Sequence, residues 1–219
     1  DDPSGTDDPG ALLAHDLRVL EAWERIRTCR TVDREPSSTF QMFGFAQVLV
    51  AAARKVAKRD PVLAAERAVE AYAAGNDVST GPLVASMVGT AVHLQALEVL
   101  GEVWEDLPEE DRTRLAAELA RVHRLRPGLD LEAETRAVER VAATMWFDGT
   151  CRDAHGAALD RARTAMAEDP ERLRAPRSPS LADRLTGCGD GVERAVASWL
   201  EDEATLEDEV RALVDQGMQ

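Results

Sequence analysis

Apolar residues recur at intervals of three and four along most of this sequence, and this spacing limits the fold more than any other feature. The clearest series is Leu13, Leu17, Leu20, Trp23 and Ile26, whose side chains share one face of a helix. Ala and Leu, both strong helix formers, supply much of the apolar content. No segment alternates apolar and polar residues over the length of a strand. The sequence therefore predicts an all-α protein with no sheet.

Gly, Pro and acidic residues divide this pattern into segments with short connections. Helices are expected at about 11–29, 40–58, 61–75, 83–104, 108–125, 130–147, 152–167, 192–201 and 205–216. Asp60 is expected to cap the third of these, and Gly75 to end it. Short connections make consecutive helices antiparallel neighbours. We therefore predict seven to nine helices in stacked antiparallel hairpins, as a bundle or a short solenoid-like array.

The longest apolar stretch spans residues 83–104. Small residues such as Ala85, Gly89 and Ala96 lie within it and would let another helix approach closely. We therefore expect this segment to be the central and most buried helix. No run approaches 18 consecutive apolar residues, so no transmembrane helix is predicted.

Composition suggests three parts. Residues 1–10 (DDPSGTDDPG) resemble a flexible acidic spacer, residues 11–149 a main helical domain, and residues 150–219 a smaller, more irregular helical part packed on it. Such spacers often follow a cleaved export signal or a lipid-anchored cysteine, so we expect a periplasmic or exported protein, with a lipid anchor N-terminal to this sequence if it is a lipoprotein. A cytoplasmic location stays open, because a chain cut here for other reasons would begin in the same way.

The net charge of −15 is concentrated at the two ends of the chain. Residues 1–10 carry four acids and no base, residues 201–219 carry seven acids and one base, and the remainder has 30 acids against 25 bases. Such a field repels nucleic acid and anionic membranes, whereas a basic protein partner or a cation would fit it. The acidic runs 109–111 and 201–203 are expected to be solvated helix ends.

One segment resembles a known repeat. The run LAAERAVEAYAAGND at 63–77 is similar to the second helix of a tetratricopeptide-type repeat in its Ala, Tyr and Gly positions. The Trp-Leu-Gly-Tyr positions of a complete repeat do not recur at a 34-residue period. More loosely, residues 60–105 resemble uncharacterised bacterial α-helical, tetratricopeptide-like proteins that are predicted to be exported. This resemblance implies a helical array and supplies no activity, cofactor or functional residue.

The three cysteines are Cys29, Cys151 and Cys188. In an exported protein one pair is expected to oxidise. Cys151 follows a Gly-Thr helix break and Cys188 lies between two glycines, so both lie in the irregular part of the chain where a crosslink would help most. We favour a Cys151–Cys188 disulfide with Cys29 free, and three reduced cysteines remain the alternative.

Cys151 also gives a metal hypothesis. His155 follows it by four residues, which places both side chains on one helix face at a spacing that can chelate a metal, and Cys188 could complete the site. No CxxC or HExxH motif accompanies them, and a disulfide at Cys151 would exclude the site. No cofactor is predicted.

Two further groups of residues have both a functional and a structural interpretation. Trp104, Trp146 and Phe147 could line a pocket for an apolar ligand, although helix packing is the more usual role of such residues. His93 lies within the apolar segment and is expected to be a hydrogen-bonded core residue rather than a catalytic base.

No GxGxxG, GxxxxGK[ST] or GxSxG motif occurs. The first functional hypothesis is a non-catalytic protein-interaction or scaffold protein of the bacterial cell envelope. The second is an acidic inhibitor or immunity-type protein that binds a basic partner. The third is a helical metal-binding protein or enzyme that uses Cys151, His155 and Cys188. The sequence leaves the partner and the oligomeric state open.

A free-thiol count tests the disulfide. We expect alkylation of the denatured, unreduced protein from its native compartment to modify one cysteine, read as one adduct in the intact mass. Modification of all three cysteines would contradict the disulfide and remove its support for export.

Overall fold

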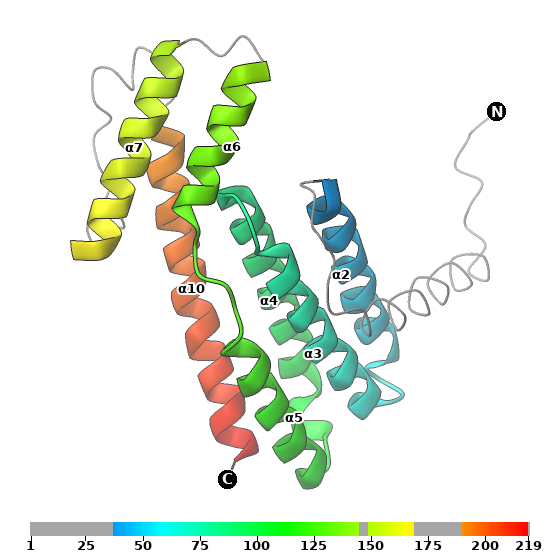
Figure 1. Ribbon diagram of the computed structural model, residues 1–219. Coiled ribbons are helices and arrows are strands. Elements are labelled where there is room, and N and C mark those ends of the chain that lie inside the picture. The colour runs from blue at the N-terminus through cyan, green and yellow to red at the C-terminus, as the bar shows by residue number, and fades with distance from the viewer. Residues whose placement is uncertain (1–36, 145–148, 169–189, 219) are drawn as a thin grey trace, which may run out of the picture.

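The computed structural model describes residues 37–144, 149–168 and 190–218. Within these ranges the chain forms seven α-helices and one short 3-10 turn, with no strand, which confirms the all-α prediction. The elements are α2 (Ser37–Val56), α3 (Pro61–Val78), α4 (Leu83–Val103), η1 (Trp104–Asp106), α5 (Glu109–His123), α6 (Leu131–Thr144), α7 (Gly149–Glu168) and α10 (Asp190–Gly217). Helices α2 to α5 alternate in direction, as stacked hairpins require (Figure 1).

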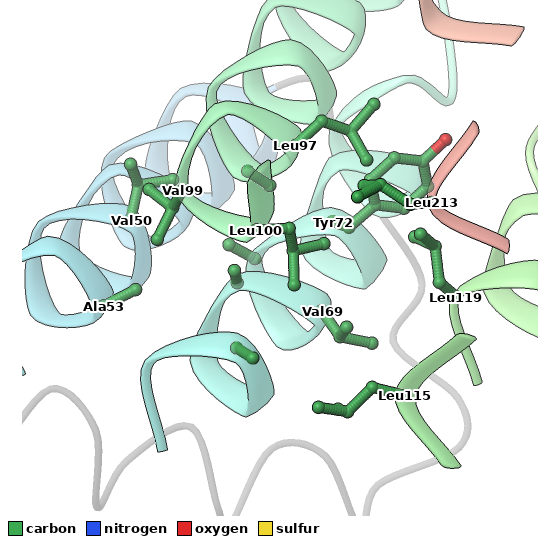
Figure 2. Close-up of a cluster of buried hydrophobic side chains, with 14 of the residues drawn as sticks. Val50, Ala53, Val69, Tyr72, Leu97, Val99, Leu100, Leu115, Leu119 and Leu213 are labelled. Carbon is green, nitrogen blue, oxygen red and sulfur yellow. The ribbon is translucent and has the colours of Figure 1, made fainter. Parts of the chain in front are cut away.

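The main core is formed by α2, α3, α4, α5 and the second half of α10. Helix α3 packs against α2 and α4, α5 packs against α3, and α10 packs against α4 and α5. Figure 2 shows the side chains that meet there, among them Val50, Ala53, Val69, Tyr72, Leu97, Leu100, Leu115, Leu119 and Leu213. Helix α4 contacts α2, α3, α6 and α10, as expected for the central helix.

A second apolar cluster lies where α6, α7 and the first half of α10 meet the start of α4. Its buried members are Leu83, Leu131, Ala158, Leu159, Ala162, Ala165, Val192 and Val196. Figure 1 shows α10 running from the α6–α7 pair to the far end of α5. Helix α10 therefore contributes to both clusters, while the predicted domain boundary near residue 149 stays a prediction.

Glycine allows α3 and α4 to cross closely. A Cβ atom on Gly89 would lie 1.9 Å from Ser79 Oγ and 2.8 Å from the Gly75 carbonyl oxygen, and one on Gly75 would lie 2.5 Å from His93 Cδ2. The expectation that Gly75 ends its helix is wrong, because α3 continues to Val78. Gly75 serves close packing instead, and its carbonyl accepts hydrogen bonds from the amide and hydroxyl of Ser79.

Two other expectations about helix ends have different outcomes. The Asp60 cap is confirmed, since its carboxylate accepts a hydrogen bond from the Leu63 amide at 3.0 Å. The division of the last segment into two helices is wrong, because α10 is continuous over 28 residues. Its apolar stripe continues through Leu206 and Val210 into the main core, so packing maintains the helix across the acidic run 201–203.

The segment Leu83–Asp106 is long and apolar enough, by length and composition alone, to cross a membrane, and its most apolar 18-residue window has a mean hydropathy of 1.5. Of its most apolar 18-residue window, 61% is buried inside the protein. A core helix and a membrane span share this composition. The prediction of no transmembrane helix therefore stays a prediction.

The glycine crossing gives a paired stability test on one helix. We expect Gly89→Ala to destabilise the protein by about 1–3 kcal/mol, because the added methyl meets backbone that must shift. Gly101→Ala is the control, since a Cβ there has no neighbour within 4 Å, and we expect it to be neutral or to stabilise by about 0.5–1 kcal/mol. Urea unfolding measures both, and equal effects would contradict the packing explanation.

Candidate functional site

A buried polar cluster lies where α3, α4, the end of α5 and α10 meet. On α4 it begins with Ser86, Thr90 and His93, all buried, which occupy the stripe that continues as Leu97 and Leu100 in the apolar core. This stripe is therefore polar in its first half and apolar in its second. The polar half faces polar side chains from α3, from the end of α5 and from α10.

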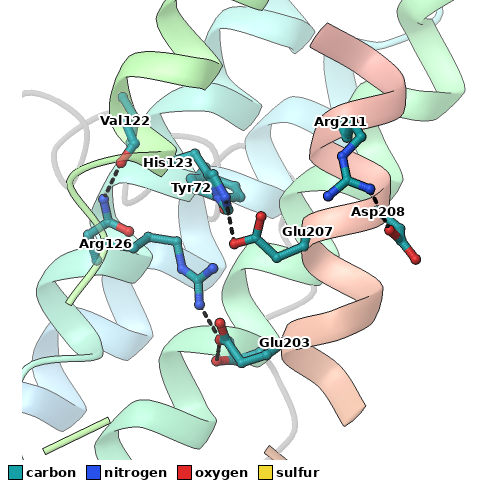
Figure 3. Close-up of polar contacts among 10 residues, drawn as sticks. Tyr72, Val122, His123, Arg126, Glu203, Glu207, Asp208 and Arg211 are labelled. Atoms are coloured by element: carbon teal, nitrogen blue, oxygen red, sulfur yellow. Dashed lines mark hydrogen bonds and ion pairs between the residues drawn. The ribbon is translucent and has the colours of Figure 1, made fainter. Parts of the chain in front are cut away.

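The first contact in the cluster is a chain of three side chains from three helices (Figure 3). The Tyr72 hydroxyl of α3 lies 2.7 Å from His123 Nδ1 at the end of α5, and His123 Nε2 lies 2.9 Å from Glu207 Oε1 of α10. When Nε2 donates to the carboxylate, Nδ1 accepts a hydrogen bond from the Tyr72 hydroxyl.

This order of hydroxyl, imidazole and carboxylate is also that of a nucleophilic triad, but the hydroxyl here is unsuited to attack. Tyr72 is completely buried, and burial raises the pKa of its hydroxyl far above the ordinary value. The phenol therefore stays protonated. The chain of contacts ties α3, α5 and α10 together.

The second contact is an ion pair between Arg126, just after α5, and Glu203 of α10 (Figure 3). The two side chains are only 9% and 19% exposed, and the Thr90 hydroxyl donates to the same carboxylate oxygen at 3.3 Å. The expectation that 201–203 is a solvated helix end is thus wrong for Glu203, which lies inside α10 and points into the cluster. The run 109–111 does form the first turn of α5.

Several polar atoms of the cluster lack hydrogen-bond partners. Six buried side-chain atoms are unpaired among the described residues, and four belong here: both ring nitrogens of His93, Asn76 Oδ1 and Arg126 Nε. The burial expected of His93 is confirmed, whereas its expected hydrogen bond stays a prediction. Burial first, and then the electrostatic effect of the Arg126 guanidinium, hold the pKa of His93 well below its ordinary value, so it is neutral near pH 7.

The structure gives the metal candidate His155 an unexpected neighbour. His155, on α7, has a side chain 17% exposed, and its Nε2 lies 3.4 Å from Glu134 Oε1 on α6. The other Glu134 oxygen accepts a hydrogen bond from the Leu83 amide at the start of α4, at 3.0 Å. The contact with His155 is the main cause that lowers the pKa of Glu134, and burial has the opposing effect. Glu134 thus connects α6, α7 and α4.

The remaining predicted site residues are placed only in part. Cys151 belongs to helix α7, and Cys188 lies outside the described residues. The disulfide and the metal site therefore remain predictions. No group of three metal-ligating side chains occurs within the described part of the chain. Trp104 is buried in the main core, whereas Trp146 and Phe147 fall outside the described residues, so the pocket also stays a prediction.

Sequence reasoning missed most of the cluster. Tyr72, the only tyrosine, lies in an Ala-rich helix, and a lone phenol there was a signal that could have been followed. Arg126, Glu203 and Glu207 carry no comparable signal, because Arg and Glu are frequent on the surfaces of helices. Their pairing depends on α10 folding back across α5.

Comparison with known proteins gives no assignment. No protein-family model, no curated protein and no solved structure gives a significant match to this chain.

The Glu134 contacts predict a pH dependence of stability. The pKa of Glu134 is lower in the folded protein than its ordinary value of 4.5, so its contribution is present above pH 4.5 and is lost as the pH falls. We expect Glu134→Gln to cost roughly 1 kcal/mol at pH 7, because the amide still accepts from Leu83 but loses the charge. Urea unfolding should show this difference shrinking below pH 4.5. A difference independent of pH would refute the assignment.

Proposed function

We propose that this chain is a non-catalytic protein-interaction or scaffold protein of the bacterial cell envelope. One observation carries the proposal: the described side chains best suited to chemistry are used in contacts between helices. Tyr72 and His93 are completely buried, and His123 joins Tyr72 to Glu207. Among the described residues, what remains for function is the outer surface of the stacked helices.

The architecture suits such a role. Hairpins stacked side by side present long helix faces, which in other helical arrays form extended binding surfaces. Glu134 links α6 to the start of α4, and α10 packs into both apolar clusters. These contacts tie the α6–α7 pair to the main body, so the faces of both parts are held in a fixed relation. The assignment to the envelope depends on the sequence alone, through its acidic N-terminal spacer.

A second function is favoured by a separate observation on the surface between α4 and α10. The pKa of Glu209 on α10 is raised by partial burial and by the neighbouring charge of Glu98 on α4. Glu98 forms an ion pair with Arg54 of α2. Because the Glu98 side chain is 60% exposed to solvent, this ion pair offsets its negative charge only in part. Two acids that repel each other would both be stabilised by a cationic partner. This observation supports the acidic inhibitor or immunity-type hypothesis.

The salt dependence of binding separates these functions. The protein is used as bait against envelope and cytosolic fractions of its source organism, and a captured partner is then purified and its Kd measured at low and high salt. The Kd of a scaffold partner held by apolar and hydrogen-bonded contacts should change little between low and high salt. A basic partner should lose about tenfold or more in affinity at high salt.

Charge-matched variants localise the effect. The double variant Glu98→Gln/Glu209→Gln removes two charges from the surface between α4 and α10. Glu118→Gln/Glu132→Gln removes two from α5 and α6 and serves as the control. Selective loss of binding in the first variant supports the basic-partner function. Failure to bind any protein saturably would contradict both functions, and a partner found only in the cytosol would contradict the envelope assignment.

The metal hypothesis has its own test. Metal analysis of the purified native protein should detect a bound ion if Cys151, His155 and Cys188 form a site, and His155→Ala should remove it. A protein without metal that folds normally after Cys151→Ser would exclude this function.

A further inference from the structure

The outward side of α4 carries apolar residues that no neighbouring helix covers completely. Helix α4 lies between α2 and α10, which both pack against it (Figure 1). Val84 is 60% exposed and Ala91 is also exposed, while Val88 and Leu94 are half-buried. These four residues follow one another at steps of four, three and three, so they form one stripe on the helix surface, which we call the α4 stripe. Contiguous exposed apolar surface of this kind is typical of a binding site.

Polar contacts with the neighbouring helices mark the two edges of this exposed face. On the α2 side, Gln95 accepts a hydrogen bond from the Gln47 side-chain amide at 3.0 Å. On the α10 side, the Thr90 hydroxyl lies 3.3 Å from the Glu203 carboxylate. Successive residues of a helix are about 100° apart, so Ala91 lies between Thr90 and Gln95 around the helix. The middle of the α4 stripe is therefore open between α2 and α10.

The same face becomes acidic toward the end of α4. Glu98 and Glu102 are both exposed and continue the line of the stripe, and Glu209 of α10 is close enough to Glu98 to feel its negative charge. Arg54 pairs with Glu98, whereas Glu102 and Glu209 have no ion-pair partner among the described residues. The C-terminal end of the helix dipole adds to the negative potential here. One face thus combines an apolar first half with an acidic second half.

We propose that this face of α4 binds an amphipathic helix of a basic partner protein. Apolar side chains of that helix would cover the α4 stripe, and its Lys or Arg residues would pair with Glu98, Glu102 and Glu209. From Val84 to Glu102 the face is about 27 Å long, which matches a partner helix of about 18 residues. This inference rests on the proposed basic-partner function, and it names the surface and the part of the partner that fits it.

Charge favours this occupant over two others. A second copy of the chain would bring the same acids to the interface, where Arg54 is the one base already paired with them, so the copies would repel each other. An anionic membrane is repelled by the net charge of −15. A basic segment is attracted both by the whole chain and by the acidic half of the face.

Peptide binding to the full chain tests the proposal. The probe is a fluorescein-labelled helical peptide of about 18 residues, with Leu at steps of three and four in one half and Lys in the other. A second peptide with the two halves exchanged covers the opposite orientation. We expect one of them to bind saturably in anisotropy titrations. Replacing its Lys by Gln, or raising the salt to about 0.5 M, should weaken binding about tenfold. A peptide of the same composition in scrambled order should bind more weakly.

Two alanine variants localise the binding. Ala91→Arg places a bulky positive charge on the α4 stripe, and Ala117→Arg makes the same change at an exposed alanine of α5. Arg is a good helix former, so both variants should fold, which circular dichroism checks. We expect Ala91→Arg to raise the Kd of the peptide about tenfold or more and Ala117→Arg to leave it within about twofold. Equal effects of the two variants, or no saturable binding of either peptide, would overturn the proposal.

The remaining outcomes separate this proposal from the proposed function. If a captured basic partner binds the Ala91→Arg variant as tightly as the parent protein, the basic-partner function stands and the α4 face is the wrong surface. If the parent protein binds the peptide but captures no partner, the surface stands and the proposed function fails. A concentration-dependent dimer that Ala91→Arg abolishes would identify a second copy as the occupant and would also overturn the proposal.

Discussion

The close crossing of α3 and α4 is the constraint on which the rest of this structure depends. Gly75 and Gly89 bring the two backbones so near that a methyl group on either would collide with a neighbour. This approach fixes where the α4 stripe of Ser86, Thr90 and His93 lies, and hence what α5 and α10 can pack against.

Helix α10 is held by two kinds of force with different consequences. Its apolar residues Leu206, Val210 and Leu213 contribute burial, which is non-directional and stabilises any register that covers them. The bridges from Glu203 and Glu207 are directional and fix one register. A buried ion pair adds little net stability compared with an apolar pair, so its value here lies in specifying the position of α10.

The same helix joins the two parts of the molecule. Its first half packs in the cluster around α6 and α7, and its second half packs in the main core. Glu134 adds a polar connection by capping the start of α4 from α6. A change in the position of α10 would therefore affect both clusters. An interaction surface on these helices would change with it.

The sequence by itself determined the helices, because periodicity, the Asp60 cap and the breaks between hairpins are local properties of neighbouring residues. It also identified the central helix from its apolar length. It failed at Gly75, which looked like a helix end, and at the acidic run 201–203, which looked like solvated surface. Only the tertiary structure decided those roles, and it alone brought Tyr72, His93, Arg126 and Glu203 together. The physical reason is that pairing between distant residues, such as Arg126 and Glu203 at 77 positions apart, depends on how whole helices pack, and no local pattern in the chain encodes it.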